Sequence, residues 1–136
     1  MSDTLTEIAH EIARGLWDTW EKDGQIIVRT SVMLPSGDGI MISIQKDAGR
    51  FYQVSDLCIG HQEADRLELG KEYEALASNM AKGGYVRCDH GAIVIHGVDR
   101  KQLTKATIMV ANAVARLLLT AQLYGIQALD KPALIH

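Results

Sequence analysis

Apolar and polar residues follow a helical period at the start of this chain. From Thr4 onward, apolar residues recur every three or four positions and form one stripe of an amphipathic helix: Leu5, Ile8, Ile12, Leu16 and Trp20. Thr4 and Glu7 have the spacing of a capping box, in which two side chains satisfy free amide groups at a helix start. Asp23-Gly24 is a turn signal, so the first helix is predicted to run from Thr4 to about Lys22.

Two alternating sets of side chains, such as Ile26, Val28, Thr30 and Val32 against Ile27, Arg29, Ser31 and Met33, then predict three strands, at residues 26–33, 40–45 and 51–54. Proline and glycine mark a turn at 35–39, and Asp47-Ala48-Gly49 marks the next one. Connections this short cannot carry a parallel crossover, so we expect the three strands to pair in antiparallel fashion.

The helical period returns at His61 and continues to Gly83-Gly84, a pair typical of a helix C-terminus. Gly70 interrupts this segment, and we expect a break there because glycine costs about 1 kcal/mol inside a helix. Residues 85–96 predict a hairpin, and Asp99 caps a long last helix. The predicted order is α-β-β-β-α-β-β-α, an α+β domain with helices packed on a mainly antiparallel sheet.

Length and composition fit one ordinary globular domain. The chain has 136 residues, of which 47% are hydrophobic and 23% charged, and its net charge is −3. Acidic and basic residues are interspersed, which argues against the basic face that nucleic-acid binding requires. We expect residues 1–125 to form the domain and residues 126–136 a C-terminal extension.

The chain carries no pattern that predicts export or a membrane span. Its start has neither a basic region nor an early apolar run, as a signal peptide would. The longest apolar stretch, residues 106–119, is shorter than the ~20 residues that cross a bilayer. These features predict a soluble, cytoplasmic protein with reduced cysteines.

The last predicted helix is apolar almost all round, apart from a narrow polar line through Lys105, Asn112 and Arg116. Such a helix is normally buried, but one small sheet covers only one of its sides. Two explanations stay open: the first helix covers the other side, or a second copy of the chain does so in a homodimer. The residues expected at that dimer interface are Ile108, Met109, Ala115, Leu118 and Leu119.

Two cysteine–histidine pairs are candidate zinc ligands. Cys58 and His61 are three residues apart across a strand–helix junction, and Cys88 and His90 lie two apart on one face of a predicted strand. A Cys2His2 set is usual for structural zinc. The spacing differs from that of common zinc modules, however, and free cysteines are often buried for packing alone. Both interpretations stay open, and no other cofactor is expected.

Small polar residues beside the strands are candidates for binding or catalysis. Asp38 lies in a Gly-Asp-Gly turn, and Ser55-Asp56 ends the third strand, where both residues would also serve as helix caps. The element order resembles the core of restriction endonucleases, whose metal site would use an acid such as Asp38. Gln45-Lys46 are adjacent and face opposite sides of their strand, so the remaining acid–lysine pattern is missing.

Several short segments carry a resemblance to a known family. They are Ile27-Val28-Arg29-Thr30, Gly37-Asp38-Gly39-Ile40, Val54-Ser55-Asp56 and Gly84-Tyr85-Val86. With them, residues 20–120 resemble a small uncharacterised domain of bacteria and phages, which has a Gly-Asp hairpin and a strand closing on Ser/Thr-Asp-x-Gly. Ser31 stands where that family often has proline, and Leu57-Cys58 delay the motif's glycine to Gly60. The resemblance implies a fold and a phage or mobile-element setting, without an activity.

The missing catalytic set and the apolar last helix together favour a non-enzymatic protein-interaction module. Its expected partners are a second copy of the chain and another protein, a host or defence complex in the setting that the resemblance implies. Two alternatives remain: a metal-dependent, nuclease-like enzyme with a degenerate site, and a zinc-stabilised structural domain.

Overall fold

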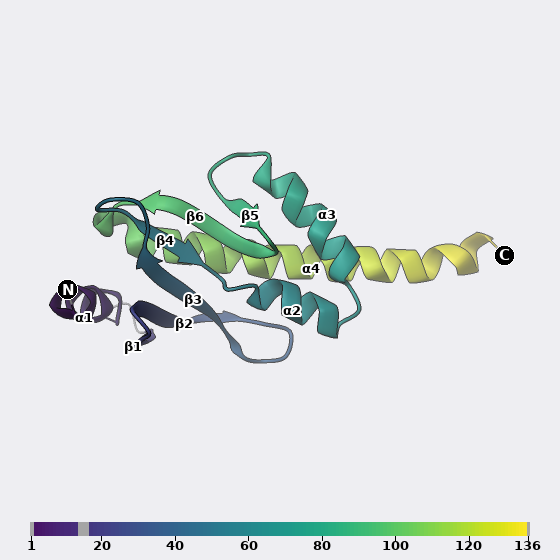
Figure 1. Ribbon diagram of the computed structural model, residues 1–136. Helices are drawn as coiled ribbons and strands as arrows, with labels where there is room; N and C mark the ends of the chain where they lie inside the picture. The colour runs from purple at the N-terminus through teal and green to yellow at the C-terminus, as the bar shows by residue number, and fades with distance from the viewer. Residues whose placement is uncertain (1, 14–16, 136) are drawn as a thin grey trace.

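The computed structural model describes the backbone of residues 2–13 and 17–135, and the side chains of residues 4–12 and 17–125. Within these ranges, six strands form one sheet in the order β1-β2-β3-β4-β6-β5, and each neighbouring pair is antiparallel. The long helix α4 runs behind the sheet, with α1 at one end and α2 and α3 at the other (Figure 1). This architecture confirms the predicted α+β class.

The bounds of the elements place each strand and helix along the chain. The strands are β1 (Asp18–Lys22), β2 (Gln25–Met33), β3 (Gly39–Lys46), β4 (Tyr52–Ser55), β5 (Arg87–Asp89) and β6 (Ala92–Val98). The helices are α1 (Ser2–Ala13), α2 (Ile59–Arg66), α3 (Gly70–Ala81) and α4 (Leu103–Ile135), with a 3-10 turn η1 (Arg100–Gln102) before α4.

The core lies between the sheet and the helices. Along β3, Ile40, Ile42 and Ile44 are fully buried in it, whereas Met41 and Gln45 point to the opposite face of the sheet and are half-buried. The helix α4 packs against β2, β3, β4 and β6 from the core side. Mainly aliphatic side chains therefore hold the sheet and α4 together by removing apolar surface from water.

The predicted strands after the first helix, the hairpin of β5 and β6, and the interruption near Gly70 are confirmed. A β-carbon at Gly70 would overlap the carboxylate of Asp65, so glycine suits the place where α2 gives way to α3. The Asp99 cap is confirmed too, since its carboxylate accepts a hydrogen bond from the amide of Lys101 at 3.3 Å.

The prediction that the first helix reaches Lys22 is wrong. The helix α1 ends at Ala13, and Asp18–Lys22 form the edge strand β1, paired with β2. Trp20, expected in the apolar stripe of that helix, is 36% exposed and lies near the guanidinium of Arg29. Leu16, another residue of that stripe, is outside the described residues.

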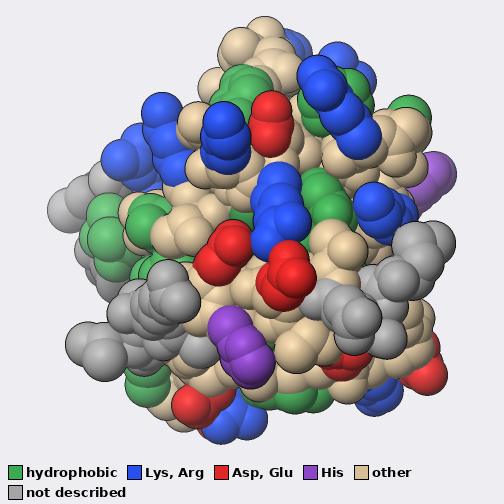
Figure 2. Space-filling view, turned by 90° about the vertical axis from the view of Figure 1, so that its left-hand side faces the viewer, with side chains coloured by type: hydrophobic (Ala, Val, Ile, Leu, Met, Phe, Trp, Pro, Cys, Tyr) green, Lys and Arg blue, Asp and Glu red, His purple; other side chains and the backbone are tan. Residues whose placement is uncertain are grey.

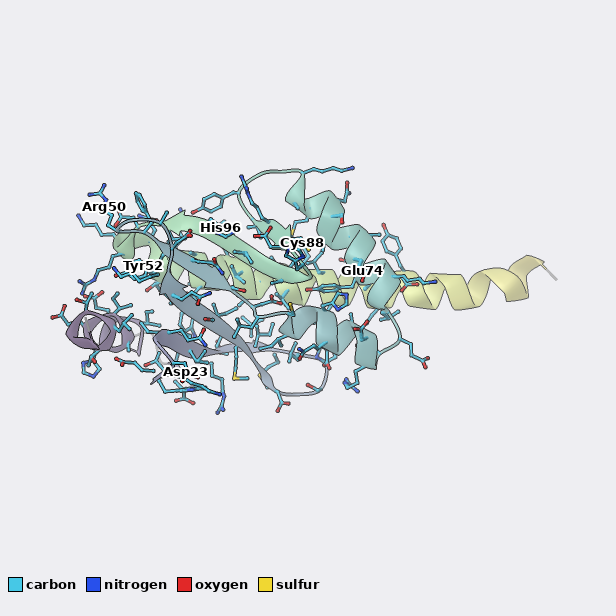
Figure 3. The ribbon with its side chains drawn as sticks, viewed as in Figure 1. Asp23, Arg50, Tyr52, Glu74, Cys88 and His96 are labelled. Carbon is cyan, nitrogen blue, oxygen red and sulfur yellow. The ribbon has the colours of Figure 1, made fainter. Side chains whose placement is uncertain are left out.

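The turn at Asp23-Gly24 explains the error. Asp23 has φ 51° and Gly24 has φ 78°, so both central residues adopt the positive φ of a type I′ hairpin turn. Asp-Gly between two alternating segments is a hairpin signal, and it reverses the chain into β2 rather than ending a helix. Asp23 marks the tip of this hairpin in Figure 3.

The C-terminal extension predicted for residues 126–136 is helical over its described part. The backbone of α4 continues without a break to Ile135. In Figure 1 this part of α4 extends past the sheet and past α3. Residue 136 lies outside the described range.

The end of the molecule at the left of Figure 1 carries charges of both signs. Figure 2 looks onto this end, where Lys and Arg side chains alternate with Asp and Glu rather than forming a field of one sign. The guanidinium of Arg100 in η1 pairs with Glu7 at 3.1 Å and with Glu11 at 3.0 Å. These pairs fasten α1 to the start of α4 and are too exposed to contribute much stability.

Candidate functional site

The helix α4 is buried on the side that faces the sheet and exposed on the other. Val110, Val114 and Leu118 are almost completely buried, whereas Ile108 and Leu119 are 41% and 59% exposed. The five residues expected at a dimer interface therefore do not all lie on the exposed side of the helix. Leu118 is almost completely buried in the core, because the turn of the helix points it at the sheet, so it offers little exposed surface to a partner.

The exposed side of α4 presents a row of residues that we name the outer ridge: Ile108, Asn112, Ala115, Leu119 and Leu123. Their spacing of four, three, four and four positions keeps them on one side of a helix. Leu123 is 53% exposed, so three large aliphatic side chains of the ridge face solvent. The first helix, α1, packs on β1 and β2 and leaves this ridge uncovered.

A shallow groove lies on one flank of the outer ridge, between α4 and the connection from β2 to β3. We name it the loop groove; it has a volume of about 420 Å³ and is lined by Met33, Leu34, Pro35, Ala115, Leu118, Leu119 and Gln122. Met33 is 56% exposed, and it adds a large apolar side chain beside Leu119. The apolar surface therefore continues from the helix onto the loop.

Glu63 fixes the loop that forms the far wall of the loop groove. Its buried carboxylate accepts hydrogen bonds from the amide of Ser36 at 2.8 Å and from Nε of Arg66 at 2.7 Å. The bond from Arg66, more than the bond from Ser36, lowers the pKa of Glu63. A charged side chain of α2 thereby holds the loop in place.

A second groove lies on the other flank of the outer ridge, between α3 and α4. We name it the helix groove; its volume is about 550 Å³. Its apolar lining consists of Leu76, Met80, Val86, Met109, Ala113 and Leu117, and its rim of Asn79, Asn112, Arg116 and Thr120. Of the residues expected at an interface, Met109 lines this groove, while Ala115 lines the loop groove.

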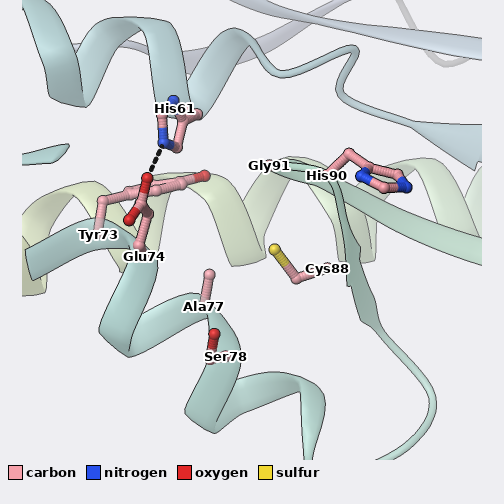
Figure 4. A pocket seen from close by; sticks show the side chains of 8 residues that line it. All are labelled: His61, Tyr73, Glu74, Ala77, Ser78, Cys88, His90 and Gly91. Carbon is pink, nitrogen blue, oxygen red and sulfur yellow. Dashed lines mark hydrogen bonds and ion pairs between the residues drawn. The ribbon is translucent and has the colours of Figure 1, made fainter. Parts of the chain in front are cut away.

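The four candidate zinc ligands come near one another around a cavity of about 440 Å³ between α3 and the turn from β5 to β6. His61, Cys88 and His90 line it, and the thiol of Cys58 lies 3.6 Å from the carbonyl oxygen of His90. Figure 4 shows the ring of His90 turned away from Cys88. In the part of the chain that the structure describes, no three His, Cys, Asp or Glu side chains are grouped so that they could hold a metal ion.

His61 of this cavity lies close to two carboxylates. Nε2 of His61 lies 2.8 Å from Glu74 and its Nδ1 lies 3.3 Å from Asp65. Figure 3 shows Cys88 on β5 beside α3, which carries Glu74. Burial raises the pKa of Cys58 and of Cys88, which keeps both thiols protonated and weakly nucleophilic.

Ser55 and Asp56 serve the fold. The carboxylate of Asp56 is completely buried and accepts hydrogen bonds from the amides of Cys58 at 3.0 Å, Gly60 at 3.0 Å and Ile93 at 2.8 Å. The Ser55 hydroxyl accepts a hydrogen bond from the amide of Leu57 at 3.0 Å. Of the two interpretations of this pair, ligand binding and capping, the geometry therefore favours capping.

Asp38 lies apart from these groups, in the exposed turn between β2 and β3. Its backbone carbonyl accepts a hydrogen bond from the amide of Leu34 at 2.7 Å, which closes the turn. The nuclease-like arrangement would need a lysine beside it, but Lys46 lies at the other end of β3, 4.8 Å from the centre of the Tyr52 ring. The structure does not bring the parts of that site together.

A charged cluster lies on the face of the sheet that is turned away from α4. The sequence did not predict it. Nδ1 of His96 lies 3.3 Å from Asp47, and its Nε2 lies 2.7 Å from Asp89. Asp47 also accepts a hydrogen bond from the amide of Gly97 at 2.9 Å. Asp47 is far from the other two residues in sequence, so no local spacing could have revealed the cluster.

No family model, no curated protein and no solved structure matches this chain. Residues 100–125 form one helical segment that is long and apolar enough to cross a membrane, judged by length and composition. Core helices pass the same test, and Val110 and Val114 of this segment are packed against the sheet.

Proposed function

We propose that the protein is a non-enzymatic protein-interaction module that forms a homodimer through the outer ridge of α4. The observation that carries this proposal is the exposure of Ile108, Leu119 and Leu123 in one row, beside the exposed Met33. Single exposed apolar residues are common on proteins, but a contiguous apolar row beside a surface groove is typical of a binding surface.

A second copy suits this surface because the surface is complementary to itself. In a two-fold symmetric contact, the ridge of each protomer meets the same region of its partner. Leu119 of one protomer would enter the loop groove of the other, as side-chain ridges of packed helices enter grooves. Between Ile108 and Leu119 the ridge itself carries Asn112 and Ala115 and no charge, and Arg116 lies at its edge.

Asn112 gives the contact a defined register. Its amide is both donor and acceptor, so it can pair with the same amide of a second copy. A buried Asn in a helix–helix seam lowers stability but specifies alignment and oligomeric state. The module would use the resulting dimer to bind a further protein, such as the host or defence complex implied by the family resemblance.

Light scattering and sedimentation test the dimer directly. The protein should be a dimer at tens of micromolar, and Leu119→Glu should weaken association by at least about tenfold, because it places a charge in an apolar contact. Tyr85→Glu is the matched control, since Tyr85 is 56% exposed and lies off α4. A monomeric wild type, or equal effects of the two variants, would refute the proposal.

A further inference from the structure

The helix groove has an apolar floor, and the residues of this floor are not part of the outer ridge. Leu117 at its base is buried, and Leu76, Met80, Met109 and Ala113 along its walls are half-buried and packed on the core. Two methionines give the floor a flexible, polarisable surface that adapts to different apolar side chains. The floor is thus already formed and partly open to solvent.

The length of the groove suits a helix. A neighbouring depression of about 490 Å³ shares Leu76 and Asn79 with the helix groove and extends it to Lys82 and Tyr124. The wall formed by α3 has 12 residues. At a rise of about 1.5 Å per residue this wall is roughly 18 Å long, which matches about three turns of a docked helix.

The helix groove and the neighbouring depression carry two basic groups, Arg116 at the rim of the groove and Lys82 in the depression. Arg116 and Lys82 are exposed, and within the described residues neither takes part in an ion pair. Asn79 adds an exposed amide on the side of α3. Glu72 is the acidic member of the lining and lies in the neighbouring depression.

We infer that the helix groove binds an amphipathic helix of a partner protein, whose apolar face contacts Met80, Met109 and Ala113 and whose acidic flank faces Arg116 and Lys82. Helix-in-groove docking uses apolar residues at i, i+3 or i+4, and i+7 of the bound segment. The inference rests on the proposed function and names the class of partner. In a two-fold contact of groove on groove, the basic groups of each copy would meet those of the other, so a second copy fits this groove poorly.

A displayed library of helical peptides with randomised surface positions tests the inference on the full chain. Selected peptides should share apolar residues at helical spacing and an excess of Asp and Glu on one flank. Their affinity, measured by fluorescence anisotropy of synthetic peptides, should fall at least about tenfold with Arg116→Glu, and should weaken as salt rises. Peptides with the acidic flank replaced by lysine should recover binding to Arg116→Glu.

Two controls separate this site from the dimer contact. Leu119→Glu on the outer ridge should leave peptide affinity unchanged, whereas Met109→Glu in the groove should abolish it, with folding of each variant checked by circular dichroism. Failure to select any peptide, selection of basic peptides, or loss of affinity with Leu119→Glu alone would overturn the inference. A monomeric wild type that still binds the peptides would instead refute only the homodimer.

Discussion

At the scale of single residues, Gly60 at the start of α2 is tightly enclosed by its neighbours. A β-carbon there would overlap the hydroxyl of Tyr73 and lie 2.8 Å from Cγ1 of Val114. Among the described residues, that hydroxyl is also the buried side-chain polar atom without a hydrogen-bond partner. Burial raises the pKa of Tyr73, so the group stays protonated. The hydroxyl therefore fills space without forming a bond.

A double-mutant cycle tests this role of Tyr73. Gly60→Ala should cost about 1–3 kcal/mol of unfolding free energy, because the core cannot accept the added methyl group. Tyr73→Phe should be neutral or stabilising by up to about 1 kcal/mol, since it removes an unpaired buried polar group. When Gly60→Ala is combined with Tyr73→Phe, its cost should shrink. Urea denaturation measures all four proteins, and a strongly destabilising Tyr73→Phe would mean that the hydroxyl has a partner.

At the scale of elements, Asp56 joins three parts of the fold. It follows β4, accepts from the amides at the start of α2, and accepts from the amide of Ile93 in β6. Burial raises its pKa, and the hydrogen bonds from Ile93, Gly60 and Cys58 act in the opposite direction. A single carboxylate thereby fixes the junction that leads from the sheet to α2.

Replacing Asp56 should be costly. Asp56→Asn keeps one acceptor oxygen but turns an NH2 group toward backbone amides, so we expect a loss of about 2–3 kcal/mol in unfolding free energy. Asp38→Asn is the control, because Asp38 lies in an exposed turn and its replacement should stay within about 0.5 kcal/mol. Guanidinium denaturation compares the two, and equal effects would contradict the structural role of Asp56.

Some of the elements could be predicted from the sequence alone, and others could not. Alternation along β2 and β3 and the glycine at position 70 are local signals, so those elements were predictable. The strand β1 was missed because Trp20 also fits a helical stripe, and the Asp23-Gly24 signal suits a helix stop as well as a hairpin.

Whether Leu118 or Leu119 faces solvent depends on how α4 is rotated against the sheet, which no local pattern determines. The loop groove and the helix groove depend on tertiary packing and could not be predicted.

At the scale of the whole molecule, folding stability should depend on pH through the cluster of His96, Asp47 and Asp89. Hydrogen bonds, first to Asp89 and then to Asp47, raise the pKa of His96 in the folded state. The hydrogen bond from the amide of Gly97, followed by the bond to His96, lowers the pKa of Asp47. The cluster links β5, β6 and the turn after β3. A change in its protonation therefore changes how firmly these three parts of the sheet are held together.

The sign of the pH effect follows from these shifts. The stabilisation from His96 is complete below its unfolded pKa of about 6.5 and is lost as pH rises through the higher folded pKa. Asp47 contributes above its unfolded pKa of about 3.9, and that contribution is lost as pH falls through the lower folded pKa. Because both side chains are partly exposed, each effect should stay below about 1 kcal/mol.

Urea denaturation from about pH 6 to pH 9 isolates the His96 contribution. The stability difference between wild type and His96→Gln should be largest at the acidic end of this range and should shrink toward the basic end. Asp47→Asn should flatten the same dependence, because it removes one of the two carboxylates that hold the imidazolium. A difference that is constant with pH would show that the cluster does not stabilise the fold through charge.

The division of α4 between core and outer ridge has a consequence for how this chain can change over time. Adding or deleting a single residue within the helix turns everything beyond that point by about 100°, which would drive Leu119 inward and bring core side chains out to water. Replacements on the ridge leave the interior untouched. Lineages of this protein can therefore alter this exposed surface one side chain at a time, while the length of the helix between Ile108 and Leu123 stays fixed.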